Sequence, residues 1–423
     1  MFSFFLGSVL NFPRSLKSTP LQRCLVGGVL AGIFLGSAAS SVARAGSLPL
    51  QQVAQTRHMV WNAVARFRGA TLVGGPRWAW PASDNRQFLS VASTGADTQT
   101  PWPDADWNSW RPGEDPRHKF VNVNALHIAP DGDLWIVDTG TPVFGSGPLP
   151  NAAKVVRIDA TNGQIRRIYP LGPELALPGS YIDDVRFHGP YAFLTDAGRP
   201  GLLVLNMDTG QARRVLNAVP ATTAQPDRPI VVPFAPPGSA DTTIPATTTI
   251  VRAPDGKPLR INTDPIEVSP DGSWLYFGTL EGPWSKVPTA ALENPDLSPA
   301  QLEAQVSPWA NLPPVGGTAI DAEGNLYFSN LREDAEQVRA PDGTISTLTR
   351  SPELHWVDAP FLDSQGLLWL PVSQLDRAAP FNKGQTRIHF PVQLFRISVA
   401  GVPARLHGTA QYLNPFKIFN VKK

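Results

Sequence analysis

The feature that most constrains this chain is a short hairpin pattern that recurs along it. In its clearest copy, residues 124–138 read NALHIAPDGDLWIVD, with two apolar runs on either side of an Asp-Gly turn. Similar copies occupy residues 62–73, 183–196, 264–277, 316–328 and 358–370. Alternating apolar residues around a glycine-containing turn are typical of a β-hairpin, because glycine adopts the positive φ that such turns require. The pattern therefore predicts six hairpins.

Several copies are followed by a second, more polar hairpin, as at residues 155–168, 202–215 and 338–348. Two hairpins form a four-stranded sheet. The turn glycines of the six copies follow one another at intervals of 63, 57, 83, 52 and 42 residues. Four-stranded units repeated at about this period are typical of a propeller, in which a closed ring of sheets buries every face. We predict an all-β fold, a six-bladed β-propeller of four-stranded antiparallel blades, with the apolar hairpin innermost.

The composition agrees with short strands. The 423 residues include 44 prolines and 35 glycines, and proline is disfavoured in helix interiors and central strands. Helical bundles and coiled coils are thereby excluded. We expect residues 46–423 to form a single propeller domain with irregular insertions near residues 75–120 and 218–260. The second insertion is rich in Pro and Thr, and we interpret it as a long surface loop over one face, either a lid or a linker.

The N-terminal residues 1–45 carry four basic and no acidic side chains. An apolar run at residues 24–35 is followed by Ala43-Arg44-Ala45, which has small residues at the spacing a signal peptidase needs. This pattern predicts a signal peptide, with an uncleaved membrane anchor as the alternative. Cleavage would remove Cys24, the only cysteine, and would exclude disulfides and cysteine nucleophiles. We expect a secreted or periplasmic protein that meets no membrane beyond this export signal.

A candidate site follows from the propeller geometry. The inner strands of all blades begin around one end of the central channel, so residues at their starts converge on one mouth. Alignment of the six copies places Gly316 in the fifth copy and polar side chains in the other five: Asn62, Asn124, Asp183, Asp264 and Asp358. This alignment predicts a polar ring at one mouth. The three carboxylates of that ring would raise one another's pKa in the absence of a cation.

Three interpretations of this ring remain open. The side chains cap strand ends and bind water, or they contact an organic ligand directly, or they hold a metal. Carboxylate and amide oxygens are the ligands that Ca²⁺ or another hard divalent cation prefers. The metal-ligand candidates are Asn124, Asp183, Asp264 and Asp358. No other cofactor is expected.

Two residues close to the ring are further ligand-binding candidates. His355 and Trp356 precede Asp358, and an aromatic side chain beside the mouth would stack on a flat ring; a place in the core is the alternative for Trp356. Asp138 and Asp196 follow second strands in Asp-Thr-Gly and Asp-Ala-Gly, and we predict that they fold back onto their own turns. No nucleotide-binding glycine loop, His-Glu-x-x-His motif or Gly-x-Ser-x-Gly elbow occurs in the sequence.

The ordered motifs resemble one known family. Residues 131–140 (DGDLWIVDTG), 193–198 (FLTDAG) with 201–205 (GLLVL), 270–277 (PDGSWLYF) and 394–397 (LFRI) resemble motifs of the major royal jelly/Yellow protein family in collinear order. The resemblance implies a secreted six-bladed propeller; some members convert dopachrome and others bind biogenic amines. The animal members carry disulfide-forming cysteines that this chain lacks, so it resembles a bacterial exported branch, whose substrate does not carry over.

The predicted architecture is also similar to that of gluconolactonase-like propellers, which hold one divalent ion in a ring of Glu, Asn and Asp and use it to polarise a lactone carbonyl. We expect a Yellow-like exported propeller that binds a small organic ligand at one channel mouth. The alternative is an enzyme, either a metal-dependent gluconolactonase-like hydrolase or a dopachrome-type isomerase, that uses the Asp/Asn ring. The sequence assigns no catalytic residue. With a net charge of +1 and no basic block, we expect no nucleic-acid partner, and we expect a monomer.

Overall fold

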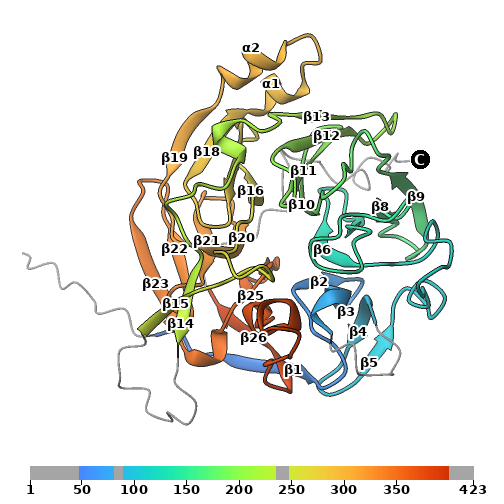
Figure 1. The fold of residues 1–423 in the computed structure, drawn as a ribbon, viewed down its shortest axis with the longest axis vertical. Helices are drawn as coiled ribbons and strands as arrows, with labels where there is room; N and C mark the ends of the chain where they lie inside the picture. The colour runs from blue at the N-terminus through green and yellow to red at the C-terminus, as the bar shows by residue number, and fades with distance from the viewer. Residues whose placement is uncertain (1–46, 81–88, 235–246, 400–423) are drawn as a thin grey trace, which may run out of the picture. The chain divides into compact units, whose positions relative to one another are not determined.

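Six four-stranded antiparallel sheets surround a central axis, as Figure 1 shows. The computed structural model describes residues 47–80, 89–234 and 247–399, all of which belong to one compact unit. The signal peptide predicted for residues 1–45 lies outside the described residues. The fold is the six-bladed β-propeller of four-stranded antiparallel sheets that the hairpin repeat predicts.

Five blades follow the chain from the innermost strand outward. The first two contain β2 (Ala63–Phe67), β3 (Ala70–Gly74), β4 (Val91–Thr94) and β5 (Gln99–Pro101), then β6 (Val123–Ile128), β7 (Leu134–Asp138), β8 (Lys154–Ile158) and β9 (Ile165–Pro170). The third contains β10 (Ile182–His188), β11 (Tyr191–Asp196), β12 (Leu202–Asn206) and β13 (Ala212–Val215). The fourth and fifth contain β16 (Thr263–Val268), β17 (Trp274–Thr279), β18 (Trp284–Pro288) and β19 (Ser307–Ala310), then β20 (Val315–Ile320), β21 (Leu326–Asn330), β22 (Ala335–Arg339) and β23 (Ile345–Arg350).

The sixth blade joins the two ends of the propeller sequence. Its strands, from the inside outward, are β24 (Phe361–Leu362), β25 (Leu367–Pro371), β26 (Val392–Ser398) and β1 (Gln51–Thr56). The register places Gln51 opposite Arg396 and Thr56 opposite Val392. The hairpin repeat does not predict β1, because that strand belongs to no hairpin. Its pairing with β26 closes the ring and gives the sixth blade four strands, as in the other five blades.

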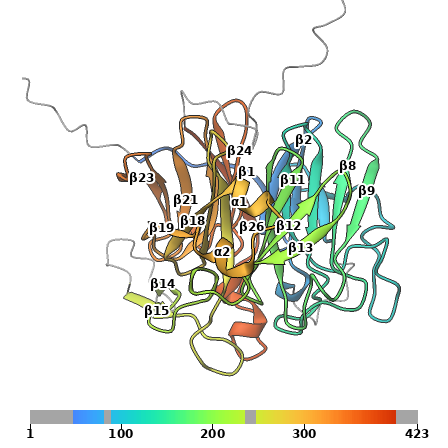
Figure 2. The same cartoon turned by 90° about the horizontal axis from the view of Figure 1, so that it is seen from above.

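The remaining elements lie outside the blades. Strands β14 (Val231–Phe234) and β15 (Thr247–Ile250) pair with each other, and Figure 2 shows them at one end of the propeller, beyond the blades. The helices α1 (Thr289–Glu293) and α2 (Pro299–Glu303) are short. No helix among the described residues is long and apolar enough to span a membrane.

Both segments expected to be irregular contain strands. The segment near residues 75–120 supplies β4 and β5, which complete the first blade, and the segment near 218–260 supplies β14 and β15. These strands have three or four residues each and include Pro101 and Pro233, so they lack a clear period of alternating apolar residues.

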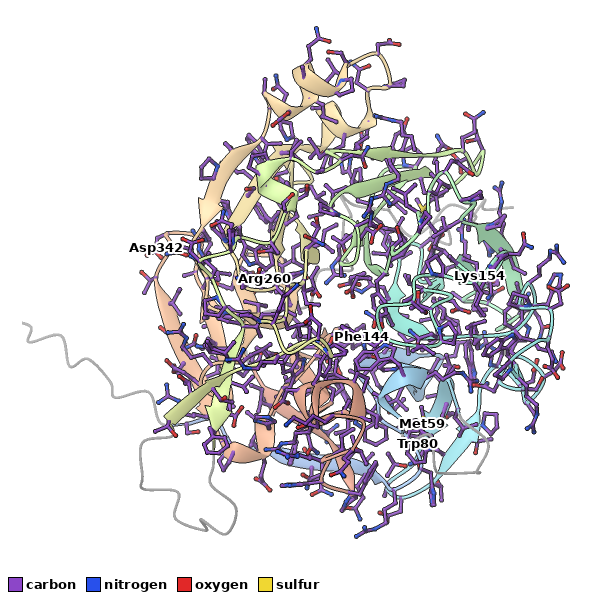
Figure 3. The ribbon with its side chains drawn as sticks, viewed as in Figure 1. Met59, Trp80, Phe144, Lys154, Arg260 and Asp342 are labelled. Atoms are coloured by element: carbon purple, nitrogen blue, oxygen red, sulfur yellow. The ribbon has the colours of Figure 1, made fainter. Side chains whose placement is uncertain are left out.

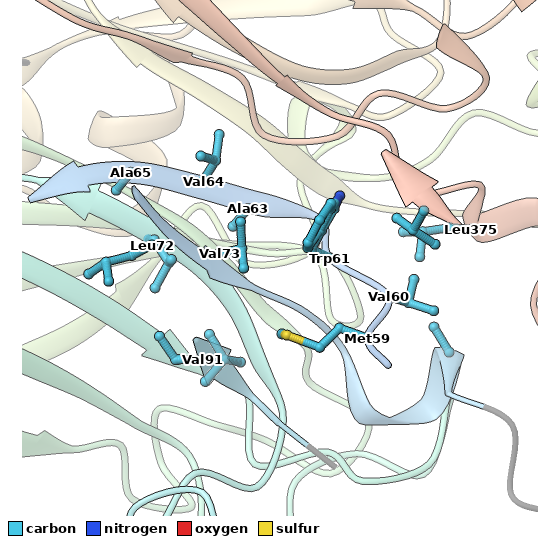
Figure 4. Packing of buried hydrophobic residues seen from close by; sticks show 14 of the residues in the cluster. Met59, Val60, Trp61, Ala63, Val64, Ala65, Leu72, Val73, Val91 and Leu375 are labelled. Atoms are coloured by element: carbon cyan, nitrogen blue, oxygen red, sulfur yellow. The ribbon is translucent and has the colours of Figure 1, made fainter. Parts of the chain in front are cut away.

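The core lies between neighbouring blades. Every residue of β6 and β7 is buried, whereas the outer strand β9 is mostly part-exposed, so the apolar hairpin is innermost as predicted. Trp61, Trp135 and Trp284 are fully buried, and Figure 4 shows Trp61 among the apolar side chains around β2 and β3. Burial of one such large side chain stabilises the fold by roughly 1.5–3 kcal/mol.

Candidate functional site

The inner strands carry their polar side chains at irregular positions. Antiparallel pairing with the second strand shifts register between Val123 and Ala125 in β6, between Ile182 and Val185 in β10, and between Thr263 and Ile266 in β16. A bulge of this kind bends a strand and changes the direction of the side chains within it. The polar residues of the second, third and fourth blades lie inside these shifts, so their side chains leave the regular alternation of the sheet.

The structure brings the polar ring together. Asn62 directly precedes β2, Asn124, Asp183 and Asp264 are the second residues of β6, β10 and β16, and Asp358 lies three residues before β24. All five line one cavity of about 460 Å³. Residues up to 296 positions apart in sequence therefore share one site at the start of the inner strands. Whether this cavity binds a ligand remains a prediction.

A chain of hydrogen bonds crosses four blades at the floor of the cavity. Asn62 donates through Nδ2 to Asn124 Oδ1 at 2.9 Å, and Asn124 donates through its own amide nitrogen to Asp183. Asp183 and Asp264 are hydrogen-bonded to each other. Asn62 Oδ1 is buried and accepts no hydrogen bond from the described residues. The floor thus keeps one acceptor to which none of these residues donates.

Burial sets the electrostatics of the floor. It raises the pKa of Asp183 and of Asp264 well above the ordinary range, and the negative charge of Asp358 raises both further. Burial also raises the pKa of Asp358 to about 7, against hydrogen bonds from Ala359 N at 3.1 Å and Trp356 Nε1 at 3.2 Å. The mutual effect of the carboxyl groups is the one expected from the sequence. Burial and the mutual repulsion of the carboxyl groups thus favour their protonated forms.

Tyr181 is a site residue that the sequence analysis did not select. Its hydroxyl donates to Asn124 Oδ1 at 2.8 Å and accepts from Trp78 Nε1 at 3.1 Å and Asn122 Nδ2 at 3.2 Å. Burial raises the pKa of Tyr181, with a further rise from the charge of Asp183. Tyr181 lies two residues before the ring position of its blade, as Asn122 does in the preceding blade. That repeated offset is the signal that would have identified both.

Aromatic side chains form one wall of the cavity. Trp78, Phe144 and Phe381 meet edge to face, with ring centroids 4.8 to 5.9 Å apart. They come from three separate segments: η1 (Arg77–Ala79), the loop after β7, and η5 (Ala379–Phe381). Trp356 and Leu375, which belongs to η4 (Leu375–Arg377), extend this wall. The cavity therefore has a polar floor and an apolar, largely aromatic side.

The segment that follows β15 covers the cavity. Lys257, Leu259 and Arg260 line it, and Figure 3 shows Arg260 and Phe144 close to the central axis. The Arg260 guanidinium donates to the backbone carbonyls of Gln225, Pro226 and Arg228, the last at 3.0 Å. Part of the insertion predicted to lie over one face thus lies over the channel mouth, and Arg260 ties it to residues 225–228.

A buried ion network is centred on Arg186, which lies on the same inner strand as Asp183. Arg186 forms a bidentate pair with Glu267 at 2.8 and 3.0 Å and binds Asp184 at 2.7 Å. The same guanidinium contacts His127 in the second blade at 3.4 Å and Thr318 O in the fifth at 3.3 Å. Because the second and fifth blades face each other across the ring, the Arg186 side chain lies across the channel.

The two neighbouring ligand-binding candidates, His355 and Trp356, differ in whether they reach the cavity. Trp356 lines the cavity, but His355 does not: it is 3 % exposed and bonded between Asp334 and Asp376. Gly316 supplies no side chain, and a Cβ there would lie 2.1 Å from Val357 O. The fifth blade therefore contributes close backbone packing to the mouth rather than a polar group.

The remaining polar candidates have structural roles. Asp138 accepts from Gly140 N at 3.0 Å, and Asp196 accepts from Gly198 N at 3.1 Å, so both fold back onto their own turns as predicted. His188, the last residue of β10, bonds Glu293 at 2.5 Å.

The oxygen atoms of the ring are ligands that a hard divalent cation prefers, but in this structure most of them take part in hydrogen bonds within the protein. Among residues 47–80, 89–234 and 247–399, no three His, Cys, Asp or Glu side chains are grouped closely enough to hold a metal ion. Asn124 Oδ1 accepts from Asn62 and Tyr181, and Asp358 accepts from Trp356 and its own turn. The chemistry of the donors fits a cation, and Asn124, Asp183 and Asp358 already accept hydrogen bonds from described residues, whereas Asn62 Oδ1 does not.

No protein-family model matches the chain, and no curated protein matches it. Similar solved structures include virginiamycin B lyase from Staphylococcus aureus, 13% identical with a TM-score of 0.44, covering 83% of this chain and 99% of that one. PQQ-bound aldose sugar dehydrogenase from Streptomyces coelicolor is 12% identical with a TM-score of 0.44, covering 83% and 98%. A protein described as a gluconolactonase is 12% identical with a TM-score of 0.46, covering 84% and 95%. At these values the similarity identifies no shared activity, and the resemblance to the Yellow family stays a prediction.

Proposed function

We propose that the channel-mouth cavity binds a small organic molecule that places a polar group on the Asn/Asp floor and an apolar or aromatic face against the wall. The observation that carries this proposal is the convergence of polar side chains from five blades on a single cavity with an aromatic side. Binding sites for small molecules are typically concave and mostly apolar, with a few converging polar groups. A volume of about 460 Å³ lies within the usual range.

The floor also indicates which groups the ligand carries. Asn62 Oδ1 is a buried acceptor without a partner among the described residues, and leaving such an atom unsatisfied costs roughly 1–3 kcal/mol. A hydroxyl or amine of the ligand would donate to it. Asp183 and Asp264 share a hydrogen bond, and burial raises the pKa of both, so a protonated carboxyl of this pair would donate a hydrogen bond to the ligand while its partner accepts one. An enzyme acting on the bound molecule by general acid–base catalysis would use this pair.

The proposal is tested by thermal shift with a panel of small hydroxylated and amino-substituted aromatic compounds. A compound present at about 100 times its Kd raises the free energy of unfolding by ~2.7 kcal/mol through mass action. We expect Asp264→Asn to lose this stabilisation. Asp342→Asn is the matched control, because Asp342 lies in an exposed turn at the outer edge of the fifth blade (Figure 3).

Compounds that stabilise the Asp264→Asn protein as strongly as the wild type bind elsewhere, and that result contradicts the proposal. Native mass spectrometry of the purified protein is the second readout, because a molecule retained from the cell adds its mass to the wild type and to Asp342→Asn but not to Asp264→Asn.

A metal-dependent hydrolase is the second candidate, and the three carboxyl groups with the free oxygen of Asn62 favour it. Asn124, Asp183, Asp264 and Asp358 would hold a divalent ion such as Ca²⁺ after exchange of their present hydrogen bonds. The ion would supply polarisation of a carbonyl or activation of water. Ca²⁺, Mg²⁺, Mn²⁺ and Zn²⁺ are tested alone in the same assay. A stabilisation that is absent in Asp264→Asn supports this candidate, and no shift with any of the four removes it.

We propose further that the protein acts outside the cytoplasm as a monomer and belongs to a bacterial exported branch of the Yellow family, with no nucleic-acid partner. This proposal rests on the signal-peptide pattern of residues 1–45 and on the ordered motifs. N-terminal sequencing of the protein recovered from a periplasmic or secreted fraction tests it, with Gly46 as the expected first residue.

A further inference from the structure

Trp356 has an unusual backbone for a cavity-lining residue. Its φ is +54°, a left-handed conformation that costs a non-glycine residue free energy and persists only where the surroundings hold it. In this conformation the indole is 4 % exposed, lines the cavity, and donates from Nε1 to Asp358 Oδ2 at 3.2 Å. The orientation of one wall of the proposed site therefore depends on whatever fixes Trp356.

The preceding residue is held from both sides. His355 Nδ1 lies 3.0 Å from Asp334 Oδ1, and His355 Nε2 lies 3.0 Å from Asp376 Oδ1. A carboxylate accepts hydrogen bonds and does not donate them, so both ring nitrogens carry protons and the imidazole is a cation. Hydrogen bonds between ionised partners are about twice as strong as neutral ones.

The two carboxylates belong to different blades. Asp334 lies in the turn between β21 and β22 of the fifth blade, and Asp376 lies in η4, after β25 of the sixth blade. Asp334 itself has a φ of +47°, and Gln374, which directly precedes η4, has a φ of +53°. The His355 bridge thus joins three segments that each contain a strained residue. One of these segments also carries Leu375 and leads to Phe381, both in the cavity wall.

We propose that His355 is a positioning residue for the candidate site: its imidazolium, bridging Asp334 and Asp376, holds Trp356 against Asp358 and fixes the mouth segment that carries the apolar wall. The importance of this role for binding rests on the function proposed above. The positioning itself is measurable without a ligand.

Charged neighbours determine when the bridge is intact. Burial lowers the pKa of His355, but the charges and hydrogen bonds of Asp376 and Asp334 outweigh it and raise the pKa to about 9. Arg377 and His389 also face this cluster, and the charge of His355 helps to lower the pKa of His389. The bridge is therefore intact at neutral pH and is lost as the pH rises through about 9.

The experiment follows the Trp356 indole N–H by NMR in protein labelled with ¹⁵N-tryptophan, with Trp356→Phe to assign the signal. His355→Gln removes the cation, and His188→Gln is the matched control because it removes the histidine of another His–carboxylate pair, which does not line the cavity. We expect His355→Gln alone to shift the Trp356 signal and to speed exchange of its proton by about tenfold or more, because the substitution removes both charge-assisted hydrogen bonds of the bridge.

Raising the pH of the wild type through about 9 should change the same signal and leave the remaining assigned indole signals in place, which a general loss of stability would not do. If His355→Gln does not fold, this titration and the Asp376→Asn variant replace it. A Trp356 signal that is the same in the folded His355→Gln protein, or constant throughout the titration, overturns the proposal. Failure of the compound panel to bind would contradict the proposed function and leave this result unaffected.

Discussion

Glu336 offers a quantitative test of the buried electrostatics. It lies on β22 and is fully buried. Among the described residues its carboxyl group has one hydrogen bond, from Ser329 Oγ to Oε2 at 3.0 Å, and Oε1 has no partner. Burial raises the pKa of Glu336 from 4.5 to about 8, against the Ser329 hydrogen bond. The folded protein therefore keeps this carboxyl protonated at a pH where the unfolded chain ionises it.

The direction in which stability changes with pH follows from the number of protons that each state binds. Between the two pKa values the folded state binds more protons than the unfolded state, so stability falls as the pH rises. At ~1.4 kcal/mol per unit, the loss from this group amounts to about 3–4 kcal/mol between roughly pH 5 and pH 8. Glu336→Gln removes this dependence. The buried amide adds a cost of its own, but that cost does not change with pH.

The measurement is urea unfolding of the wild type and Glu336→Gln, followed by tryptophan fluorescence across this pH range. The variant should gain stability relative to the wild type as the pH rises, by the amount given above. The acidic groups of the channel mouth titrate in both proteins and cancel in the difference. Glu303→Gln, on the exposed surface of α2, is the control and should show a constant difference. A constant difference for Glu336→Gln as well would refute the reasoning.

Three further perturbations test other parts of the structure. Arg186→Gln removes the guanidinium that pairs with the buried Glu267 and the part-buried Asp184, and it should destabilise the fold by about 3–5 kcal/mol in chemical denaturation; a loss below ~1 kcal/mol would contradict a buried network across the channel. Gly316→Ala places a Cβ 2.1 Å from Val357 O and should lower Tm, with overpacking of this kind costing ~1–3 kcal/mol, whereas an unchanged Tm would show that the backbone contact is absent. The raised pKa of His355, about 9 in the folded protein, provides stability that is complete below pH 6.5 and is lost as the pH rises through about 9, so thermal melts of the wild type and His355→Gln should converge at high pH; a constant gap would contradict this.

The sequence was sufficient to predict the ring of blades and the ring of polar residues, because both follow from one repeated hairpin. Once the copies are aligned, the residue at the start of each inner strand is defined, and the fold places Asn62 and Asp358 in one cavity although they are far apart in sequence. The bulges that turn these side chains toward the mouth leave no pattern that a single sequence reveals.

The elements that were missed depend on contacts distant in sequence. Strand β1 forms no hairpin, and its partner β26 lies more than 300 residues away. His355 was placed among the ligand-binding candidates because it adjoins Trp356, but Asp334 and Asp376, each 21 residues from it, hold it away from the cavity. Tyr181 reaches Asn124 only because the third blade packs beside the second.

The central claim is that polar side chains from different blades meet at one mouth, and a double-mutant cycle on Asn124 and Asp183 measures this most directly. These residues are 59 positions apart in sequence and are hydrogen-bonded in the structure. We predict that Asn124→Ala and Asp183→Ala are non-additive in unfolding free energy by about 0.5–3 kcal/mol, while Asn124→Ala and Asp342→Ala add within roughly 0.3–0.5 kcal/mol. Additivity of the first pair within that same margin would contradict the claim.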